Sequence, residues 1–383
     1  MNLFETSMRL LETLVRDYPA VATLLAFVLG TIVGSYLNVC IVRLPLQKSI
    51  LWPGSRCAVC LQKIRWYDNV PLVSYWVLRG RCRQCRQSFS MRYFWIELLT
   101  GVLFAGLFVW IVVWNSRALG AEQPFEPARG ISAGALVLVW LHAVTLTSLL
   151  LVATFTDLDY RVIPLGLTVA GTLLGILWGT LLPWPWPWPA EALFPAGVMT
   201  QMRFGGAGVP DRDILLLPAG LWRWPVWMPT PDTMPPGDWR LGLATGLAGA
   251  LAGALGMRLV RSAFTWGLGK EALGLGDADL MMMIGAFLGW QMLVFTLVFA
   301  VLMGVIYAVF LIVITQASEL AFGPFLAGGA LITLVFCYDL GAAFQKLFFD
   351  GPLLTALALL VLALGLFVCL SLRMVRLMVA APQ

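Results

Sequence analysis

The chain has 383 residues, of which 60% are hydrophobic and only 12% are charged, and its mean hydropathy is +0.86. A soluble domain carries about 25% charged residues, so this composition excludes a large soluble domain and indicates a polytopic membrane protein. The only histidine is His142, which argues against a Ser–His or Cys–His pair and against a metal site built from several histidines.

The first residues of the chain, 1–17, mix apolar and charged side chains without the order of a cleavable signal peptide. We expect an amphipathic helix that lies at the membrane surface.

Nine apolar runs follow, measured against the roughly 20 residues that a helix needs to cross a bilayer. The run at 280–315 is too long for one span, and we place its division near 298–304. The predicted fold is therefore an all-α polytopic membrane protein with eight to nine transmembrane helices and a small cytoplasmic zinc-binding loop. The predicted spans are 21–42, 94–114, 132–156, 165–182, 241–260, the two halves of 280–315, 325–338 and 353–372.

The predicted parts of the chain follow from these spans. They are an amphipathic segment at 1–20, the first span at 21–42, a four-cysteine loop at 43–93, helices that carry Asp157 at 94–182, a Trp- and Pro-rich insert at 183–240, helices with a GxGD sequence that contains Asp277 at 241–338, and an extra helix and tail at 339–383.

Basic residues in short loops predict the orientation of these spans, because cytoplasmic loops are rich in Lys and Arg. Residues 43–92 contain ten of them against one acid, Asp68, so we expect this loop in the cytoplasm. Alternation of the spans then places Asp157 and Asp277 on the cytoplasmic side and 183–240 outside. The tail, with Arg373 and Arg376, agrees with this topology.

Two CxxC pairs lie in the basic loop, Cys57 with Cys60 and Cys82 with Cys85. Each pair offers two thiolates, and four thiolates complete the tetrahedron of a structural zinc site. Two disulfides are the alternative, but a cytoplasmic loop stays reduced and favours zinc.

The segment between the two pairs is rich in aromatic residues and arginine, including Trp66, Tyr67, Trp76 and Arg79. These residues form either a binding surface for substrate or anionic headgroups, or the small core of the zinc module.

Asp157 and Asp277 lie at the ends of two apolar runs, where ionisable residues are costly and need a reason. Two carboxylates at such helix ends can share a proton and activate water, as in aspartic proteases. The simpler interpretation is that each is an ordinary polar helix end or cap, with Asp157 or Asp159 paired to Arg161. Gly274 and Gly276, just before Asp277, would allow backbone or substrate to approach closely.

Several motifs together resemble the type IV prepilin peptidases, which belong with the GxGD intramembrane aspartic proteases. The resemblance covers roughly residues 25–165 and 241–332. The motifs are GSYLNVCIVRLP (34–45), the two CxxC pairs, RWYDNVPLVSYWVLRGRC (65–82), SMRYFWIELLTG (90–101), FTDLDYRVIP (155–164), EALGLGDADL (271–280) and FGPFLAGGAL (322–331).

This resemblance implies a multi-pass endopeptidase of the bacterial inner membrane that cuts the leader from prepilins or pseudopilins at the cytoplasmic face. Carried over by motif, the catalytic pair is Asp157 and Asp277. Members with the four-cysteine loop commonly also methylate the new N-terminal residue with S-adenosylmethionine, so we expect that activity without assigning the donor site. The expected partners are prepilin substrates and the lipid bilayer, and no nucleic acid.

The chain departs from the family pattern in three places. The family usually has a basic residue two positions after the GxGD aspartate, where this chain has Asp279. The insert 183–240 is long where members have a short loop, and a ninth apolar run follows the usual end. The added charge of Asp279 is expected to affect a catalytic pKa or the grip on substrate.

Two other functions are compatible with the same residues. One is a membrane transporter or assembly scaffold without catalysis, in which buried acids relay ions. Such a relay expects acids near the middle of a span rather than at its end. The other is a peptidase without the methyltransferase activity.

Overall fold

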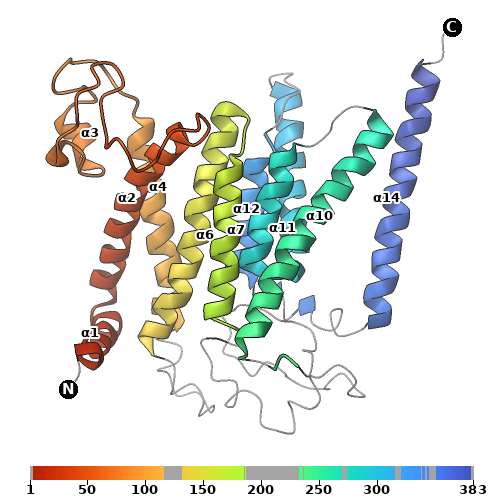
Figure 1. Ribbon diagram of the computed structural model, residues 1–383, viewed down its shortest axis with the longest axis horizontal. Helices are drawn as coiled ribbons and strands as arrows, with labels where there is room; N and C mark the ends of the chain where they lie inside the picture. The colour runs from red at the N-terminus through yellow and green to blue at the C-terminus, as the bar shows by residue number, and fades with distance from the viewer. Residues whose placement is uncertain are drawn as a thin grey trace. The chain divides into compact units, whose positions relative to one another are not determined.

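A computed structural model describes residues 3–115, 132–184, 237–269, 274–314, 321–337 and 351–380, with a few single positions between them (Figure 1). Within these ranges the chain is helical, apart from turns and two isolated β-bridges, which confirms the all-α prediction. The chain divides into two compact units, Met1–Leu167 and Thr168–Gln383.

The helices coincide closely with the predicted apolar runs. In the part of the chain that the structure describes, five stretches are long and apolar enough to cross a membrane, and α7 and α12 are shorter apolar helices. The total of eight to nine spans stays a prediction. The helices are α1 Leu3–Asp17, α2 Pro19–Arg43, α3 Val73–Val77, α4 Arg92–Phe108 with its π-helical continuation Val109–Trp114, α6 Ala133–Tyr160, α7 Leu165–Leu181, α10 Trp239–Leu268, α11 Leu275–Ile314, α12 Gly323–Val335 and α14 Gly351–Ala380.

The long apolar run near residue 300 turns at a different place from the one predicted. α11 is helical through 298–304, and the non-helical residue inside it is Gly289, with φ 76° and ψ 164°. A Cβ on Gly285 would lie 2.9 Å from Leu293 Cδ1, although eight residues of straight helix rise about 12 Å. The chain therefore bends sharply at Gly289, where a positive φ suits glycine, and the predicted division at 298–304 is wrong.

The first unit is built on a hairpin of α2 and α4, and its ends carry the cysteine module (Figure 1). A Cβ on Gly30 would lie 2.8 Å from Gly101 Cα, so the two backbones approach closely. Small residues allow apolar helices to pack in this way. α6 packs on both helices, and the indole N–H of Trp140 donates a 3.0 Å hydrogen bond to the Phe104 carbonyl.

The second unit is organised by glycines on α10. A Cβ on Gly249 would lie 2.0 Å from the Gly285 carbonyl oxygen, and one on Gly253 would lie 2.2 Å from the Met281 oxygen. The two contacts show that α10 and α11 are antiparallel and touch through their backbones. There is no room between them for even one methyl group.

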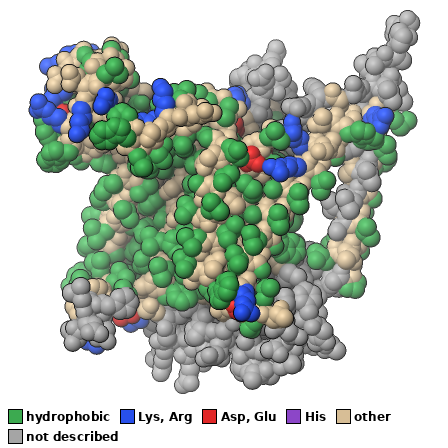
Figure 2. Space-filling view, in the orientation of Figure 1, with side chains coloured by type: hydrophobic (Ala, Val, Ile, Leu, Met, Phe, Trp, Pro, Cys, Tyr) green, Lys and Arg blue, Asp and Glu red, His purple; other side chains and the backbone are tan. Residues whose placement is uncertain are grey.

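Large apolar side chains cover the outer surfaces of the described helices (Figure 2). On α2, for example, Leu24, Leu25 and Ile32 are each more than half exposed. Because a bilayer has no water for exposed polar groups, helices with such surfaces suit a lipid environment.

The predicted insert at 183–240 lies almost entirely outside the described residues, and so do Lys270 to Leu273 before the GxGD motif. The predictions made for these segments stay predictions.

Candidate functional site

The two CxxC pairs fold into two loops with the same backbone pattern. In the first, the Leu61 N–H bonds to the Cys57 carbonyl at 3.0 Å, and Arg56 pairs with Lys63 in a β-bridge. The second loop repeats this arrangement 25 residues later, with a 3.0 Å bond from Arg86 N–H to Cys82 O and a bridge between Arg81 and Ser88. Leu61 and Arg86, which close the two turns, both have a positive φ. We call these loops the first and second knuckle.

The knuckles bring their four sulfur atoms together. All four ligand atoms lie within 4.8 Å of one another, and the Cys57 and Cys85 sulfurs are 3.7 Å apart. A tetrahedral zinc site with bonds of about 2.3 Å separates its sulfurs by about 3.8 Å. The backbone N–H groups of Cys60 and Val59 lower the pKa of the Cys57 thiol to about 6, which favours the thiolate that binds metal. The donor set and its spacing therefore fit zinc.

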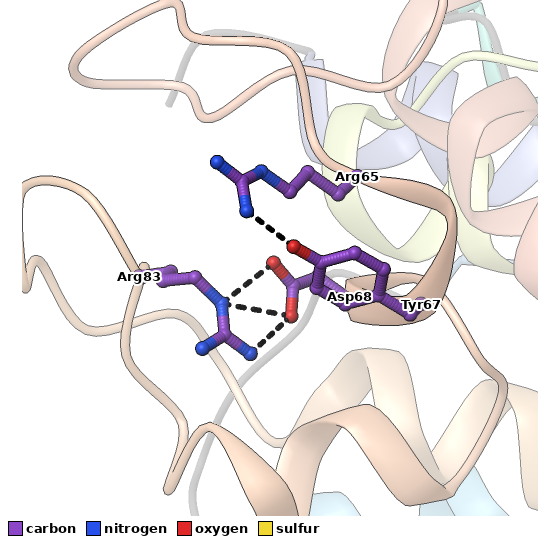
Figure 3. A network of polar contacts seen from close by, with 4 residues as sticks. All are labelled: Arg65, Tyr67, Asp68 and Arg83. Atoms are coloured by element: carbon purple, nitrogen blue, oxygen red, sulfur yellow. Dashed lines mark hydrogen bonds and ion pairs between the residues drawn. The ribbon is translucent and has the colours of Figure 1, made fainter.

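A polar network ties the segment between the knuckles to the second knuckle (Figure 3). The Arg83 guanidinium donates to both carboxylate oxygens of Asp68, with its shortest contact at 2.6 Å. Its Cζ atom also lies 5.6 Å from the centre of the Tyr67 ring, and Arg65 donates to the Tyr67 hydroxyl. The hydrogen bonds from Arg83, together with the positive charges of Arg83 and Arg65, lower the pKa of Asp68.

The aromatic residues of this segment divide between surface and core. Trp66 is 83% exposed and Trp76 is 61% exposed. The interior instead holds Tyr75, whose ring lies 5.6 Å from that of Phe89 and 6.2 Å from that of Phe94. Of the two interpretations made for this segment, the surface one fits Trp66, and the core is built from other rings. Lys and Arg side chains also gather on the surface of this module (Figure 2).

Asp157 lies in the last turn of α6, which continues four residues past its predicted end. Its side chain is buried, with 8% exposed. Arg161 ends the helix in a left-handed conformation at φ 54°, and its N–H bonds to the Asp157 carbonyl. The ion pair of Asp159 is with Arg92 at 2.6 Å, rather than with Arg161 as considered from the sequence. Because Arg92 begins α4, this pair places the end of α6 beside the cysteine module.

Asp277 lies in the first turn of α11 and is also buried, with 7% exposed. Gly274 comes just before the helix, and a Cβ there would lie 3.5 Å from an Asp277 carboxylate oxygen. Gly276 is the second residue of the helix. Asp279 pairs at 3.1 Å with Arg258 of α10, so its charge is balanced by a neighbouring helix.

Within the second unit, α7 lies beside α11. α10 runs antiparallel to both helices, which makes α7 and α11 parallel, and a Cβ on Gly175 would lie 3.0 Å from the Ala286 carbonyl carbon.

Three residues of these sites were missed by the sequence analysis. Arg92 and Arg258 are the partners of Asp159 and Asp279, and long-range partners leave no local signal. Glu97 could have been found from the sequence, because it is the one acid in the apolar run 94–114. Acids within such runs are candidates for function. Its carboxylate accepts a 2.8 Å hydrogen bond from the Leu72 N–H.

Apolar helices, a four-cysteine module and two buried aspartates at helix ends define a class: a polytopic membrane protein with acidic residues at the ends of its helices. Family comparison makes this specific. Residues 28–111 match the Bacterial Peptidase A24 N-terminal domain, and residues 144–309 match the Type IV leader peptidase family. The chain belongs to this family of leader peptidases.

Several curated relatives carry the name prepilin leader peptidase/N-methyltransferase. The protein from Myxococcus xanthus is 33% identical over 76% of this chain and 63% of its own length. The protein from Pectobacterium carotovorum is 30% identical over 80% of this chain and 91% of its own, and that from Pseudomonas putida is 27% identical over 86% and 96%. No solved structure matches the chain.

Proposed function

We propose that this chain removes the leader peptide from prepilins or pseudopilins with Asp157 and Asp277 as an aspartic dyad, and then methylates the new N-terminal amine. Family membership and the names of the relatives support both activities. The observation that carries the dyad is that each aspartate is buried in the terminal turn of an apolar helix. A buried carboxylate in such a place is costly and marks a functional site.

The chemistry follows from two carboxylates that share one proton. The ionised carboxylate takes a proton from a water molecule, whose oxygen attacks the scissile carbonyl carbon. The protonated carboxyl donates to the carbonyl oxygen, and the leaving amine nitrogen takes a proton as the C–N bond breaks. Neither step needs a histidine or a serine nucleophile, which agrees with the composition of the chain.

We place the reaction at the cytoplasmic face of the bacterial inner membrane. The ten basic residues of 43–92 favour a cytoplasmic module. The ion pair between Arg92 and Asp159 puts Asp157 at that same end of the first unit. A substrate with an apolar helix in the bilayer and a polar leader in the cytoplasm would present its cleavage site at this depth.

Zinc in the four-cysteine module has a structural role in this proposal. Cys57, Cys60, Cys82 and Cys85 would occupy all four positions of the metal, leaving none open for water or substrate. The metal would fold a module whose own core is only a few aromatic rings.

A transporter or scaffold without catalysis is the second candidate. An ion relay expects acids near the middle of a helix, whereas Asp157 lies in the last turn of α6 and Asp277 in the first turn of α11. The positions of the two acids therefore favour the peptidase.

The test is co-expression with a prepilin, followed by mass spectrometry of the product. We expect Asp157→Asn and Asp277→Asn each to lower cleavage by about a thousandfold or more, since members of a catalytic unit fail together. Asp159→Asn and Asp279→Asn are matched controls that should keep cleavage within about tenfold of wild type, because partly exposed ion pairs contribute little. Wild-type cleavage by either dyad variant would refute the assignment.

The same spectra test the second activity. A wild-type product heavier by one methyl group than the cleaved peptide supports methylation. If the cleaved product always lacks this mass when S-adenosylmethionine is supplied, the chain is a peptidase without methyltransferase activity.

A further inference from the structure

A cavity of about 350 Å³ lies within the first unit, between the cysteine module and the ends of α2 and α4. Its volume falls in the range of small-molecule sites, about 300–1,000 Å³. Cys57 and Cys82 of the four-cysteine site lie in its wall, whereas the proposed dyad makes no use of it. Its walls come from the C-terminal half of α2, both knuckles, the segment between them and the first two turns of α4.

Glu97 lines this cavity from α4. Its carboxylate accepts a 2.8 Å hydrogen bond from the Leu72 N–H, and Ser35 of α2 is a further hydrogen-bond partner. Leu72 has a positive φ of 62°, an unfavourable conformation for a branched residue that is retained where the surroundings require it. A carboxylate accepts about four hydrogen bonds, so Glu97 keeps acceptor capacity for a cation in the cavity.

Basic residues line the cavity from the first knuckle. Arg56 and Lys63 stand on facing sides of its β-bridge, and Arg65 follows. Arg83 also lines the cavity, but its charge is balanced by Asp68 (Figure 3). The cavity thus offers a carboxylate from the helix side and several cations from the knuckle side.

Aromatic rings complete the wall. Tyr75, Phe89 and Phe94 all line the cavity, and the Tyr75 ring packs against the other two at 5.6 and 6.2 Å between ring centres. Such rings provide an apolar surface for a planar base, and their faces attract cations.

We propose that this cavity binds S-adenosylmethionine, with Glu97 as the acceptor for its ammonium group, the basic residues of the first knuckle for its carboxylate, and the aromatic rings for its purine. The inference rests on the methyltransferase activity proposed above and adds its donor site. A ligand that carries an ammonium, a carboxylate, a sulfonium and a purine needs this combination of wall chemistry.

The donor would supply a methyl group to the neutral N-terminal amine. The S–CH₃ bond breaks with its electrons left on sulfur, and the lone pair of the amine nitrogen forms the N–CH₃ bond. One proton is then released from the nitrogen to water. The chain's own contribution is to hold the donor by both of its charged ends. Fixing it in this way orients the methyl group for transfer.

The test measures equilibrium binding of radiolabelled S-adenosylmethionine to the full, zinc-loaded chain in detergent, without any substrate peptide. Glu97→Gln should weaken binding by at least about tenfold, because it removes a hydrogen bond between charged groups. Glu12→Gln on α1, the same change outside the cavity, should bind like wild type. Zinc content and thermal midpoint check that each variant is folded.

A second variant tests the other end of the ligand. Lys63→Gln should weaken binding of S-adenosylmethionine but not of its decarboxylated analogue, which has no carboxylate for the basic residues to bind. Equal weakening for both ligands would overturn the assignment of the carboxylate.

Prepilin cleavage by the same wild-type preparation separates the two proposals. Donor binding that depends on Glu97 supports the cavity whether or not the preparation cleaves. Cleavage without donor binding, or binding that Glu97→Gln leaves unchanged, overturns the cavity proposal and leaves the peptidase standing. Binding of anionic lipid in place of the donor would also overturn it.

Discussion

The end of α6 and the start of α11 carry the same short pattern, Asp-x-Asp, and the two aspartates have the same environments in both places. In each, the first aspartate is buried and the second forms an ion pair with an arginine of a neighbouring helix. Asp159 pairs with Arg92 at 2.6 Å, and Asp279 pairs with Arg258 at 3.1 Å. The two ends differ in what fixes the helix that carries them.

Side chains anchor the end of α6. Arg92 bonds to Asp159 and also lies 5.1 Å from the centre of the Phe155 ring. The start of α11 is fixed mainly by backbone contact, because Gly253 of α10 lies against Met281, one turn from Asp277. The comparison teaches that equivalent acids can be positioned by exchangeable side chains or by helices in direct backbone contact.

The two ends also differ in polarity. A helix favours negative charge near its N-terminus and disfavours it near its C-terminus. Asp277 is in a first turn and Asp157 in a last turn. In the proposed dyad this difference favours Asp277 as the ionised carboxylate and Asp157 as the one that holds the shared proton.

The largest expected effect comes from filling the glycine contact at α11. Gly253→Ala should lower the free energy of unfolding by about 3 kcal/mol, since its methyl group would lie 2.2 Å from a carbonyl oxygen and force two helices apart. Gly256→Ala, on the same helix with nothing within 4 Å, should raise it by up to about 1 kcal/mol. Denaturant titration in mixed micelles measures both. Equal effects would show that backbone contact does not position α11.

A smaller effect is expected from the ion pairs. Partly exposed pairs contribute at most about 1 kcal/mol. We expect a coupling free energy near that limit for Arg92 and Asp159, and about half of it for Arg258 and Asp279, whose contact is longer and whose arginine is 52% exposed. Double-mutant cycles with Arg→Gln and Asp→Asn measure both. A larger coupling at Arg258 would reverse the contrast between the two ends.

The smallest expected effect is a change in stability with pH at the third Asp–Arg pair, Asp68 with Arg83. This pair lies in the cysteine module, away from the two helix ends, and serves as a reference for them. Hydrogen bonds from Arg83 lower the pKa of Asp68, so its contribution to stability is present above its unfolded pKa of about 4 and is lost as pH falls through the lower folded value. The stability difference between wild type and Asp68→Asn should therefore stay constant from pH 8 to pH 5. A difference that shrinks within this range would mean a raised pKa.

Much of the fold was predictable because membrane helices reveal themselves by hydropathy. The predicted runs match α2, α4, α6, α7, α10, α12 and α14 to within a few residues at most ends, although α10 and α14 extend further at their C-terminal ends. The turn within α11 was placed wrongly, because an apolar run gives no polar signal where the chain bends. Only the backbone shows that Gly289, rather than 298–304, takes the non-helical conformation.

The candidate sites also contain features that the sequence predicted and features that it did not. Cysteine spacing alone predicted that Cys57, Cys60, Cys82 and Cys85 would come together, and their ligand atoms do lie close to one another. Partners from distant helices, such as Arg92 for Asp159, depend on packing that no local pattern encodes. Glu97 was overlooked because an acid one turn inside an apolar run looks like the edge of a span.

The paired knuckles have a consequence for how a cell would use this protein. Both of them supply walls of the cavity, whereas Asp157 and Asp277 lie on α6 and α11, outside the module. Metal supply would then act as a selective control point: under zinc starvation, newly made chains would still trim their substrates yet release them with unmodified N-termini. Substrates that carry no methyl group would thus serve as a record of metal shortage at the time of their maturation.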